Sequence, residues 1–215
     1  MEESIQYKFI VEPIEVFQEV LRSWGGFDDY IAKLEVYRTE FIENGKNLYQ
    51  PDPNGYNVIN HGDFHVKNLL FKKNGADIED FFFLDYQICV LASPCVDLFY
   101  ALYNMISDEN RRNRRAEIIH DYHNEFTRTL KRLGFIGKIP SLIQLQMDLI
   151  KHGQMEVLKC IGFYIFFWPE KIGVTVGEMM AGPDSKKLKA QIFNDPEFKK
   201  FILAELPRLV QMGFL

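Results

Sequence analysis

One segment of this 215-residue chain constrains its fold more than any other. Asp63 stands five residues before Asn68, and Asp85 follows seventeen residues later. Apolar residues flank the segment at 58–59 and 69–71, and a further apolar run at 81–84 ends at Asp85. Runs of this length predict short buried strands on both sides of a loop. We therefore expect the loop and the end of the last strand to converge on one site.

These polar residues have the chemistry that phosphoryl transfer from Mg-ATP needs. One carboxylate takes or orients the acceptor proton, while an amide oxygen and a second carboxylate hold Mg²⁺ against the phosphates. Oxygen donors are the ligands that this hard cation prefers. Each residue alone also has a structural explanation, because loop Asp and Asn residues often cap turns. Their joint occurrence between strands favours a phosphotransfer site.

Four motifs occur in a fixed order: Asn60-His61-Gly62-Asp63-Phe64-His65, Asn68-Leu69-Leu70-Phe71, Leu84-Asp85-Tyr86-Gln87 and Ser93-Pro94-Cys95-Val96-Asp97-Leu98. Together they carry a resemblance to a known family. The sequence resembles the ecdysteroid kinase-like (CHK kinase-like) family, within the superfamily of choline kinases and aminoglycoside phosphotransferases. The resemblance spans most of the chain and is densest from residue 57 to 103. It implies ATP and Mg²⁺ as cofactors, and a hydroxyl of a small lipophilic molecule, ecdysteroid-like or xenobiotic, as the acceptor.

The same resemblance implies the roles of the catalytic and metal-binding residues. Asp63 corresponds to the catalytic base near the acceptor hydroxyl. Asn68 and Asp85 correspond to the Mg²⁺ ligands. His65 stands where protein kinases carry a phosphate-contacting lysine, and it could contact phosphate or substrate. Gln87 receives no chemical role.

Two further residues are implied to support the catalytic loop. His61 corresponds to a structural residue of the loop itself. Asp97 corresponds to a buried acid that accepts backbone N–H groups of the loop and keeps its shape. We expect structural support from both, rather than chemistry.

The remaining pattern predicts helices. Pro13 favours a first helical turn, and the apolar periodicity that follows it stops at Gly25-Gly26. Asp28 or Asp29 could cap a second helix, which ends at Asn44-Gly45. Asn74-Gly75 predicts the turn of a β-hairpin.

After Asp97 the chain is predicted to be mostly helical. A buried helix continues to Ile106, an amphipathic helix stops at Gly134, and a last helix opens at 194–196. The apolar segment 160–168 is interpreted as a core helix, because nine residues are far fewer than the roughly 20 that span a bilayer. The predicted class is α+β: a protein-kinase-like C-terminal lobe, mostly helical, with a short β-hairpin carrying the catalytic loop.

A nucleotide-clamping N-terminal lobe is not recognisable ahead of His61. No Gly-x-Gly-x-x-Gly motif precedes it, and the preceding 60 residues have helical patterns. We expect the chain to correspond to the C-terminal half of a family member and to be inactive by itself. The predicted organisation is a single domain, 1–215, with leading helices at 1–56, the catalytic and metal-binding segment at 57–103, and a helical remainder at 104–215.

The composition of the chain restricts the cellular compartment and the binding partners that we expect for it. A net charge of −5 gives no basic footprint for nucleic acid. Four arginines between 111 and 115 are interpreted as a solvated helix start, with an anion contact as the alternative. Three cysteines without a paired motif fit buried thiols in a reducing compartment, and no signal peptide is visible, so we expect a cytoplasmic protein without a membrane span.

Two other functions remain open. The first is a catalytically inactive, kinase-derived binding protein that uses the face an upper lobe would cover. The second, less favoured, is a metal-dependent phosphohydrolase built on clustered histidines and aspartates. Its candidates are His61, Asp63 and His65, or His120-Asp121 with His123.

Overall fold

The computed structural model describes residues 7–215 and divides into two compact units. Unit 1 joins Met1–Asn47, described from Tyr7 onward, to Gly153–Leu215. Unit 2 is the continuous segment Leu48–His152. All the predicted catalytic and metal-binding residues belong to unit 2. The three-segment organisation of a single domain stays a prediction.

The first two helices of unit 1 lie where the sequence predicts them. Helix α1 (Glu12–Trp24) has Pro13 in its first turn and ends before Gly25, whose φ of 72° suits glycine. Helix α2 (Asp28–Asn44) is preceded by Phe27, and no side chain caps it. Asp28 and Asp29 therefore lie in the first turn, where negative charge favours the helix dipole, rather than at the cap position.

Aromatic rings form the core of unit 1. Phe17 of α1 is fully buried, and its ring lies 4.8 Å from that of Phe193 and 6.2 Å from that of Trp24. Burial of one such ring contributes about 1.5–3 kcal/mol. The other helices of this unit are a π-helical turn at Tyr7–Val11, α6 (Gly153–Val157), a 3₁₀ turn at Pro169–Ile172, α7 (Val176–Ala181), α8 (Ser185–Asn194) and α9 (Pro196–Gln211).

The predicted core helix at 160–168 is buried but irregular. Leu158–Phe163 forms π-helical turns, and Tyr164–Phe167 continues as a 3₁₀ helix. Cys160, Ile161 and Ile165 are fully buried. The burial expected from the apolar sequence is confirmed, and the regular α-helical geometry is not.

A buried ion pair also joins α1 to α8 within unit 1. Nζ of Lys189 donates to Oε1 of Glu12 over 2.5 Å, and both side chains are inaccessible to solvent. Ser185 donates to the same oxygen over 2.6 Å, and Lys8 donates to Oε2 over 2.7 Å. Burial alone would raise the pKa of Glu12, but these hydrogen bonds outweigh it and lower the pKa to about 2.

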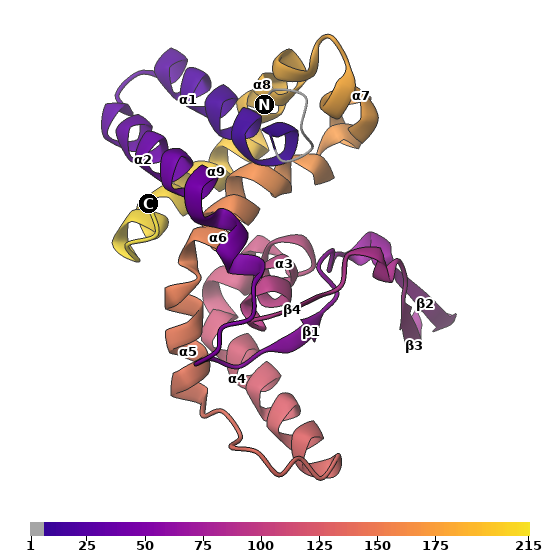
Figure 1. The fold of residues 1–215 in the computed structure, drawn as a ribbon. Helices are drawn as coiled ribbons and strands as arrows, with labels where there is room; N and C mark the ends of the chain where they lie inside the picture. The colour runs from indigo at the N-terminus through magenta and orange to yellow at the C-terminus, as the bar shows by residue number, and fades with distance from the viewer. Residues whose placement is uncertain (1–6) are drawn as a thin grey trace. The chain divides into compact units, whose positions relative to one another are not determined.

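Unit 2 contains two antiparallel strand pairs (Figure 1). Strand β1 (Val58–Asn60) pairs with β4 (Val90–Ala92), a pairing that the sequence pattern did not predict. Strand β2 (Leu69–Asn74) pairs with β3 (Asp77–Phe83) around Gly75, whose φ is 62°. The hairpin predicted at Asn74-Gly75 is therefore confirmed.

The prediction that the strands of this hairpin are buried is wrong. Leu70 and Phe82 form a cross-strand pair, and each is 57% exposed. Phe81 on the other face is 49% exposed. Among the described residues, β2 and β3 make their extensive contacts with each other, and Figure 1 shows the hairpin projecting from the rest of unit 2. A continuous apolar run predicts a strand, but it does not tell whether another element covers that strand.

Three helices complete unit 2: α3 (Cys95–Asn104), α4 (Asp108–Arg132) and α5 (Leu142–Lys151). Helix α3 is buried as predicted, with Phe99 and Leu102 inaccessible or nearly so. Helix α4 begins after the Ser107 cap and ends at Arg132, two residues before the predicted Gly134, whose φ is 69°. A 3₁₀ turn, Gly45–Tyr49, leads into the unit, and two more lie at Val66–Asn68 and Tyr86–Ile88.

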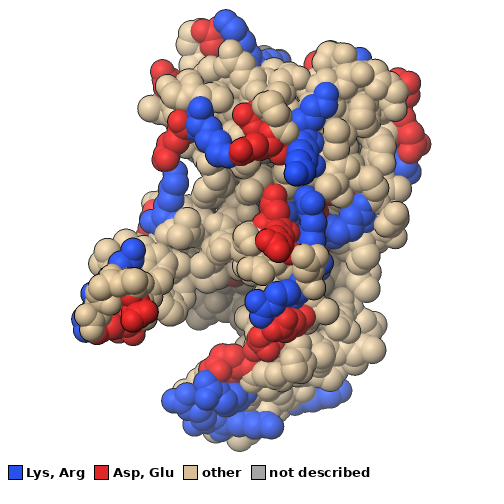
Figure 2. Space-filling view, turned by 180° about the vertical axis from the view of Figure 1, so that it is seen from behind, with Lys and Arg blue, Asp and Glu red and all other residues tan. Residues whose placement is uncertain are grey.

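The expectation for the arginines at 111–115 needs correction. Arg111 is 2% exposed, because its guanidinium stacks on the Tyr103 ring at 4.4 Å and pairs with Asp108. It is therefore not part of a solvated helix start, whereas Arg112 and Arg114 are exposed. Over much of the face drawn in Figure 2, positive and negative side chains lie next to one another.

The predicted burial of the cysteines is confirmed for two of the three. All three are free thiols, and Cys95 and Cys160 are buried. Cys89 is exposed, because the short segment between β3 and β4 that carries it lies at the surface.

The mostly helical α+β class is confirmed. Among the described residues, no strand precedes β1, so none of residues 7–57 forms a strand–turn–strand lobe ahead of the loop. In the same part of the chain, no helix combines the length and apolarity that crossing a bilayer requires.

Candidate active site

The carboxylate of Asp97 holds the backbone at the start of the loop. Its Oδ2 accepts the N–H of His61 over 2.6 Å, and its Oδ1 accepts the N–H of Gly62 over 3.0 Å. Gly62 has a φ of 84°, and a Cβ atom there would stand 2.3 Å from the carbonyl oxygen of Ile88. The loop therefore needs both the acid on α3 and a glycine at this position.

Asn60 ties the strands to the same helix. Its buried Nδ2 donates to the carbonyl oxygens of Val58 and Ala92, each over 3.2 Å, and its Oδ1 accepts the N–H of Asp97 over 3.3 Å. One side chain thus joins β1, β4 and α3. Asn60 belongs to one of the four sequence motifs, but its role in joining these elements is not evident from the sequence.

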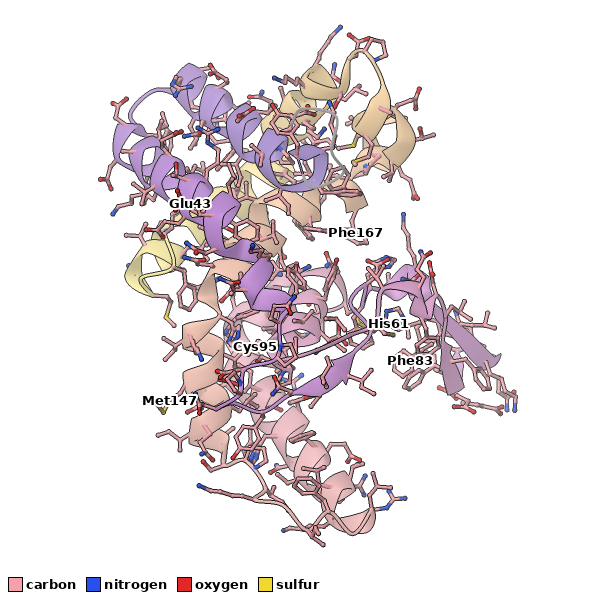
Figure 3. All side chains as sticks on the ribbon, viewed as in Figure 1. Glu43, His61, Phe83, Cys95, Met147 and Phe167 are labelled. Carbon is pink, nitrogen blue, oxygen red and sulfur yellow. The ribbon has the colours of Figure 1, made fainter. Side chains whose placement is uncertain are left out.

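His61 connects the loop to the end of β3. Its Nε2 lies 2.7 Å from the carbonyl oxygen of Leu84, and its Nδ1 lies 3.4 Å from the backbone nitrogen of Asp63. Both contacts fit the neutral imidazole with its hydrogen on Nε2, a tautomer assigned from the hydrogen-bond network. The ring is 7% exposed and lies 6.3 Å from that of Phe83, which Figure 3 labels beside it.

Asp63 receives hydrogen bonds from two other residues of the loop. The amide Nδ2 of Asn68 donates to Oδ2 over 3.1 Å and to the backbone oxygen over 2.9 Å. The Nε2 atom of His65 lies 3.2 Å from the same Oδ2. The side chain of Asp63 is 31% exposed, so it remains open to a substrate.

A third group near Asp63 comes from α3. Tyr100 is 3% exposed, and its hydroxyl lies within reach of the Asp63 carboxylate. Burial first, and then the neighbouring Tyr49, Asp63 and Asp97, raise the pKa of Tyr100 well above its usual value of 10. Sequence reasoning missed Tyr100; its position three residues after Asp97 was the available signal, because such residues share one helix face.

Asp85 follows the end of β3 and has an unusual backbone conformation. With φ and ψ both at 62°, it is the one non-glycine residue with positive φ among those described. Gln87 donates to its Oδ2 over 3.1 Å. Strained backbone of this kind costs of order 1–3 kcal/mol and is concentrated at functional sites.

The structure brings the end of β3 to the loop through backbone contacts. The N–H of Leu84 donates to the carbonyl oxygen of Asn68 over 2.9 Å, directly before Asp85. Because Asn68 uses its amide nitrogen on Asp63, its Oδ1 is the atom left to accept or coordinate. An amide oxygen and an exposed carboxylate are donors that suit Mg²⁺, so the residues present fit that ion.

A groove of about 560 Å³ opens beside the loop within unit 2. Its walls come from β1, the loop, the end of β3 and helices α3 and α4. The polar residues among them, Asn60, His61 and Asp97, already use their polar atoms on the backbone. The aromatic residues of the lining are Phe64, Phe83, Tyr86, Tyr122 and Phe126.

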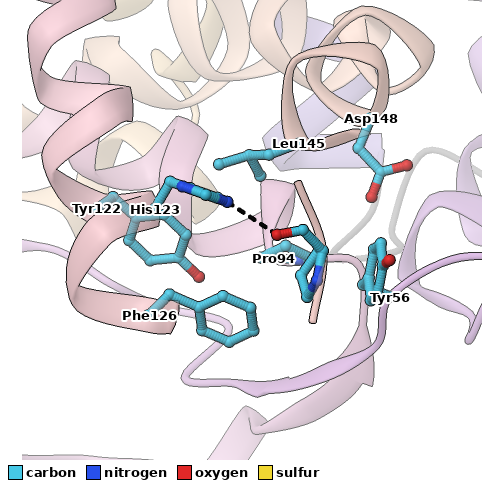
Figure 4. Close-up of a pocket in the computed structure, with 8 residues that line it drawn as sticks. Tyr56, Pro94, Tyr122, His123, Phe126, Leu145 and Asp148 are labelled. Carbon is cyan, nitrogen blue, oxygen red and sulfur yellow. Dashed lines mark hydrogen bonds between the residues drawn. The ribbon is translucent and has the colours of Figure 1, made fainter. Parts of the chain in front are cut away.

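The histidines of α4 do not form a metal centre. The Nε2 of His123 lies 2.9 Å from the carbonyl oxygen of Pro140, at the edge of a cavity of about 10 Å³ (Figure 4). The side chain of His120 is 54% exposed. Among residues 7–215, no three His, Cys, Asp or Glu side chains gather closely enough to hold a metal ion.

Comparison with known protein families identifies the family of this chain. The sequence profile of the Ecdysteroid kinase-like family matches residues 2–135, which is more than half of the chain and includes the whole loop, the hairpin and α3. No curated protein and no solved structure matches the chain. The order of motifs that suggested the family is thus supported by a match over the same residues, and the chain belongs to the ecdysteroid kinase-like family.

Proposed function

We propose that the chain carries the catalytic half of an ATP- and Mg²⁺-dependent phosphotransferase, which acts on a hydroxyl of a small lipophilic molecule such as an ecdysteroid-like compound or a xenobiotic. The observation that supports this most is the setting of Asp63. Its carboxylate accepts a hydrogen bond from Asn68, lies 3.2 Å from Nε2 of His65 and stays partly open to solvent, and its loop neighbours His61 and Phe64 line the aromatic groove. Because the chain belongs to this family, kinase-like phosphoryl transfer is the expected reaction.

In this proposal each residue of the loop has a separate task. Asp63 accepts a hydrogen bond from the acceptor hydroxyl, orients its oxygen and takes its proton. Asn68 Oδ1 and the Asp85 carboxylate would hold Mg²⁺, which neutralises phosphate charge when bound. Holding reactants in line is most of what phosphoryl transfer requires, so a rigid loop matters more than a strong base.

His65 and the supporting residues have less direct tasks. His65 contacts Asp63 and could also contact a phosphate or the acceptor. His61 and Asp97 act by shaping the loop, because their contacts are made with its backbone and with the end of β3.

The lining of the groove supports an apolar acceptor. Choline and aminoglycosides are cationic, and their recognition needs carboxylates that point at the ligand. The one carboxylate that lines this groove, Asp97, accepts two backbone N–H groups. The aromatic walls favour a flat hydrophobic body, with its hydroxyl directed toward the loop.

A binding and transfer experiment tests the proposal. Titration with a hydroxylated sterol should show saturable binding that Phe126→Ala weakens about tenfold and that Asp121→Asn leaves unchanged. Any transfer of radiolabelled γ-phosphate from Mg-ATP to the sterol should be lost in Asp63→Asn and kept in Asp121→Asn, which changes an exposed acid of α4. Near-normal turnover in Asp63→Asn, or no sterol binding by the folded protein, would contradict the proposal.

The exposed hairpin favours a second candidate function, that of a catalytically inactive binding protein. Leu70 and Phe82 form an uncovered apolar pair on one face, and Phe81 lies exposed on the other. Exposed apolar patches of this kind mark interaction surfaces. If this candidate holds, Phe82→Asp should abolish self-association in sedimentation velocity while sterol binding persists and no variant shows transfer.

A further inference from the structure

The connection between α4 and α5, within unit 2, presents apolar side chains to solvent. Its residues 131–138, which we call the α4–α5 tip, are all exposed. Leu133 is 78% exposed, Phe135 is 49% exposed, and Ile136 is fully exposed. Single exposed apolar residues are common on protein surfaces, but three within four positions form a patch that marks an interaction surface.

Local contacts fix the backbone of the α4–α5 tip. Gly134 has a φ of 69°, its N–H donates to the carbonyl oxygen of Lys131 over 3.1 Å, and the N–H of Phe135 donates to that of Leu130 over 3.0 Å. These two bonds are those of a Schellman motif, which commonly carries an apolar residue directly after its glycine. The motif therefore explains Phe135, but it gives no structural reason for a fully exposed isoleucine at the next position.

Basic side chains flank the apolar residues of the tip. The segment 126–147 contains four Lys or Arg residues and no Asp or Glu, in a chain whose net charge is −5. One of the four, Arg128, forms a salt bridge one turn back on α4. Figure 2 shows basic side chains gathered at the lower edge of the view, where the tip lies in Figure 1. The other three are exposed and form no salt bridge with any described residue: Lys131, Arg132 and Lys138.

We propose that the α4–α5 tip docks on the surface of a bilayer that contains anionic lipids. Leu133 and Ile136 would enter the boundary between headgroups and acyl chains, while the three cations bind the lipid phosphates and carboxylates. Apolar residues bordered by Lys and Arg are the composition that binds such surfaces. A fluid lipid layer closes around a projecting isoleucine, whereas a protein partner would need a pocket shaped to receive it. The inference does not depend on the phosphotransferase function proposed above.

Docking at the tip would bring the aromatic groove of unit 2 near the membrane. Phe126, which lines that groove, lies on α4 seven residues before Leu133. At 1.5 Å per residue, this separation is about 10 Å along the helix axis. A lipophilic molecule dissolved in the bilayer would then be concentrated close to the groove.

Co-sedimentation with vesicles tests the role of the cations. Wild-type protein should bind vesicles of phosphatidylcholine with about one-third phosphatidylserine much more tightly than vesicles of phosphatidylcholine alone. Each Lys or Arg at an anionic surface strengthens binding about fivefold, so Lys131→Gln/Arg132→Gln/Lys138→Gln should bind about a hundredfold more weakly.

A matched triple variant separates the tip from the total charge of the chain. It removes three exposed lysines of unit 1 that also form no salt bridge with a described residue, and it should bind within about threefold of the wild type. These changes are Lys46→Gln, Lys187→Gln and Lys200→Gln.

Two changes at Ile136 test insertion of the apolar residues. Ile136→Asp should weaken binding to the same vesicles about tenfold, while Val36→Asp, at an exposed apolar position of α2, should leave it unchanged. In Ile136→Trp, vesicles should shift the added tryptophan emission to the blue, and brominated lipid should quench it. The emission of the wild type, which comes from Trp24 and Trp168, should show neither effect.

The outcomes decide the inference whether or not the chain transfers phosphate, since neither ATP nor an acceptor is present. No binding of the folded wild type to phosphatidylserine vesicles overturns it, and so does equal weakening by the two triple variants. Emission of Ile136→Trp that vesicles leave unchanged overturns it as well. Self-association in sedimentation velocity that Ile136→Asp abolishes, without vesicle binding, would overturn it and assign the tip to a contact between two copies of the chain.

Discussion

Replacement of Asp97 by asparagine removes one of the two hydrogen bonds that hold the catalytic loop. The carboxylate accepts the N–H of His61 over 2.6 Å and that of Gly62 over 3.0 Å. An asparagine side chain keeps one acceptor oxygen but turns an NH₂ group toward the second N–H. One backbone donor is then left unsatisfied, and the remaining bond loses its charge.

The expected cost follows from the strength of these bonds. Hydrogen bonds to charged groups contribute about 1.5–3 kcal/mol each. We therefore expect Asp97→Asn to lower the free energy of opening the loop by about 2 kcal/mol, which corresponds to about a 30-fold increase in the open population. The global stability of unit 1 should not change, because Asp97 contacts residues of unit 2.

Native-state amide hydrogen exchange measures this opening residue by residue. The amides of His61 and Gly62 should exchange about 30-fold faster in Asp97→Asn. Asp121→Asn, which changes an exposed acid on α4, serves as the control and should leave both rates unchanged. If the two amides accelerate less than about threefold in Asp97→Asn, the carboxylate does not hold the loop and this reasoning is refuted.

Three further predictions follow from particular contacts. Gly62→Ala should destabilise unit 2 by several kcal/mol in urea unfolding, because its Cβ would stand 2.3 Å from the Ile88 carbonyl oxygen; Gly134→Ala, at a φ of 69° in open space, should cost only about 1 kcal/mol. Glu12→Gln should cost about 3 kcal/mol at pH 7, since the folded-state pKa is lowered from 4.5 to about 2. That contribution is fully present above pH 4.5 and is lost as the pH falls through 2, so wild type and variant should converge in acid unfolding experiments, and a pH-independent difference would count against it. A thiol reagent should label one cysteine per native chain and three in denaturant, and Cys89→Ser should remove the native reaction; labelling of the native variant would show that a buried thiol is accessible.

The sequence predicted what local signals determine. Pro13 and Gly25 marked the ends of the first helix, and Asn74-Gly75 marked the hairpin turn. These signals act through backbone geometry within a few residues, so no knowledge of tertiary contacts is needed. The order of the catalytic motifs was likewise enough to identify the family, which the profile match over residues 2–135 supports.

What the sequence could not supply is the contacts between distant residues. The run at 81–83 has the pattern of a buried strand, yet whether a strand is covered depends on elements that its own periodicity does not report. Tyr100 lies close to Asp63 across 37 positions of sequence, and α3 carries a second buried tyrosine, Tyr103, from which the sequence pattern does not distinguish it. The roles of Asp63, Asn68 and Asp85 stay predictions, which the experiments above address.

The central claim is that the loop and the end of β3 form one Mg-nucleotide site. Calorimetric titration of the chain with ATP in the presence of Mg²⁺ tests it most directly. The account predicts saturable, Mg²⁺-dependent binding that is lost in Asp85→Ala and retained in Asp121→Ala. Binding that Asp85→Ala leaves unchanged, or no binding by a folded sample, would contradict it.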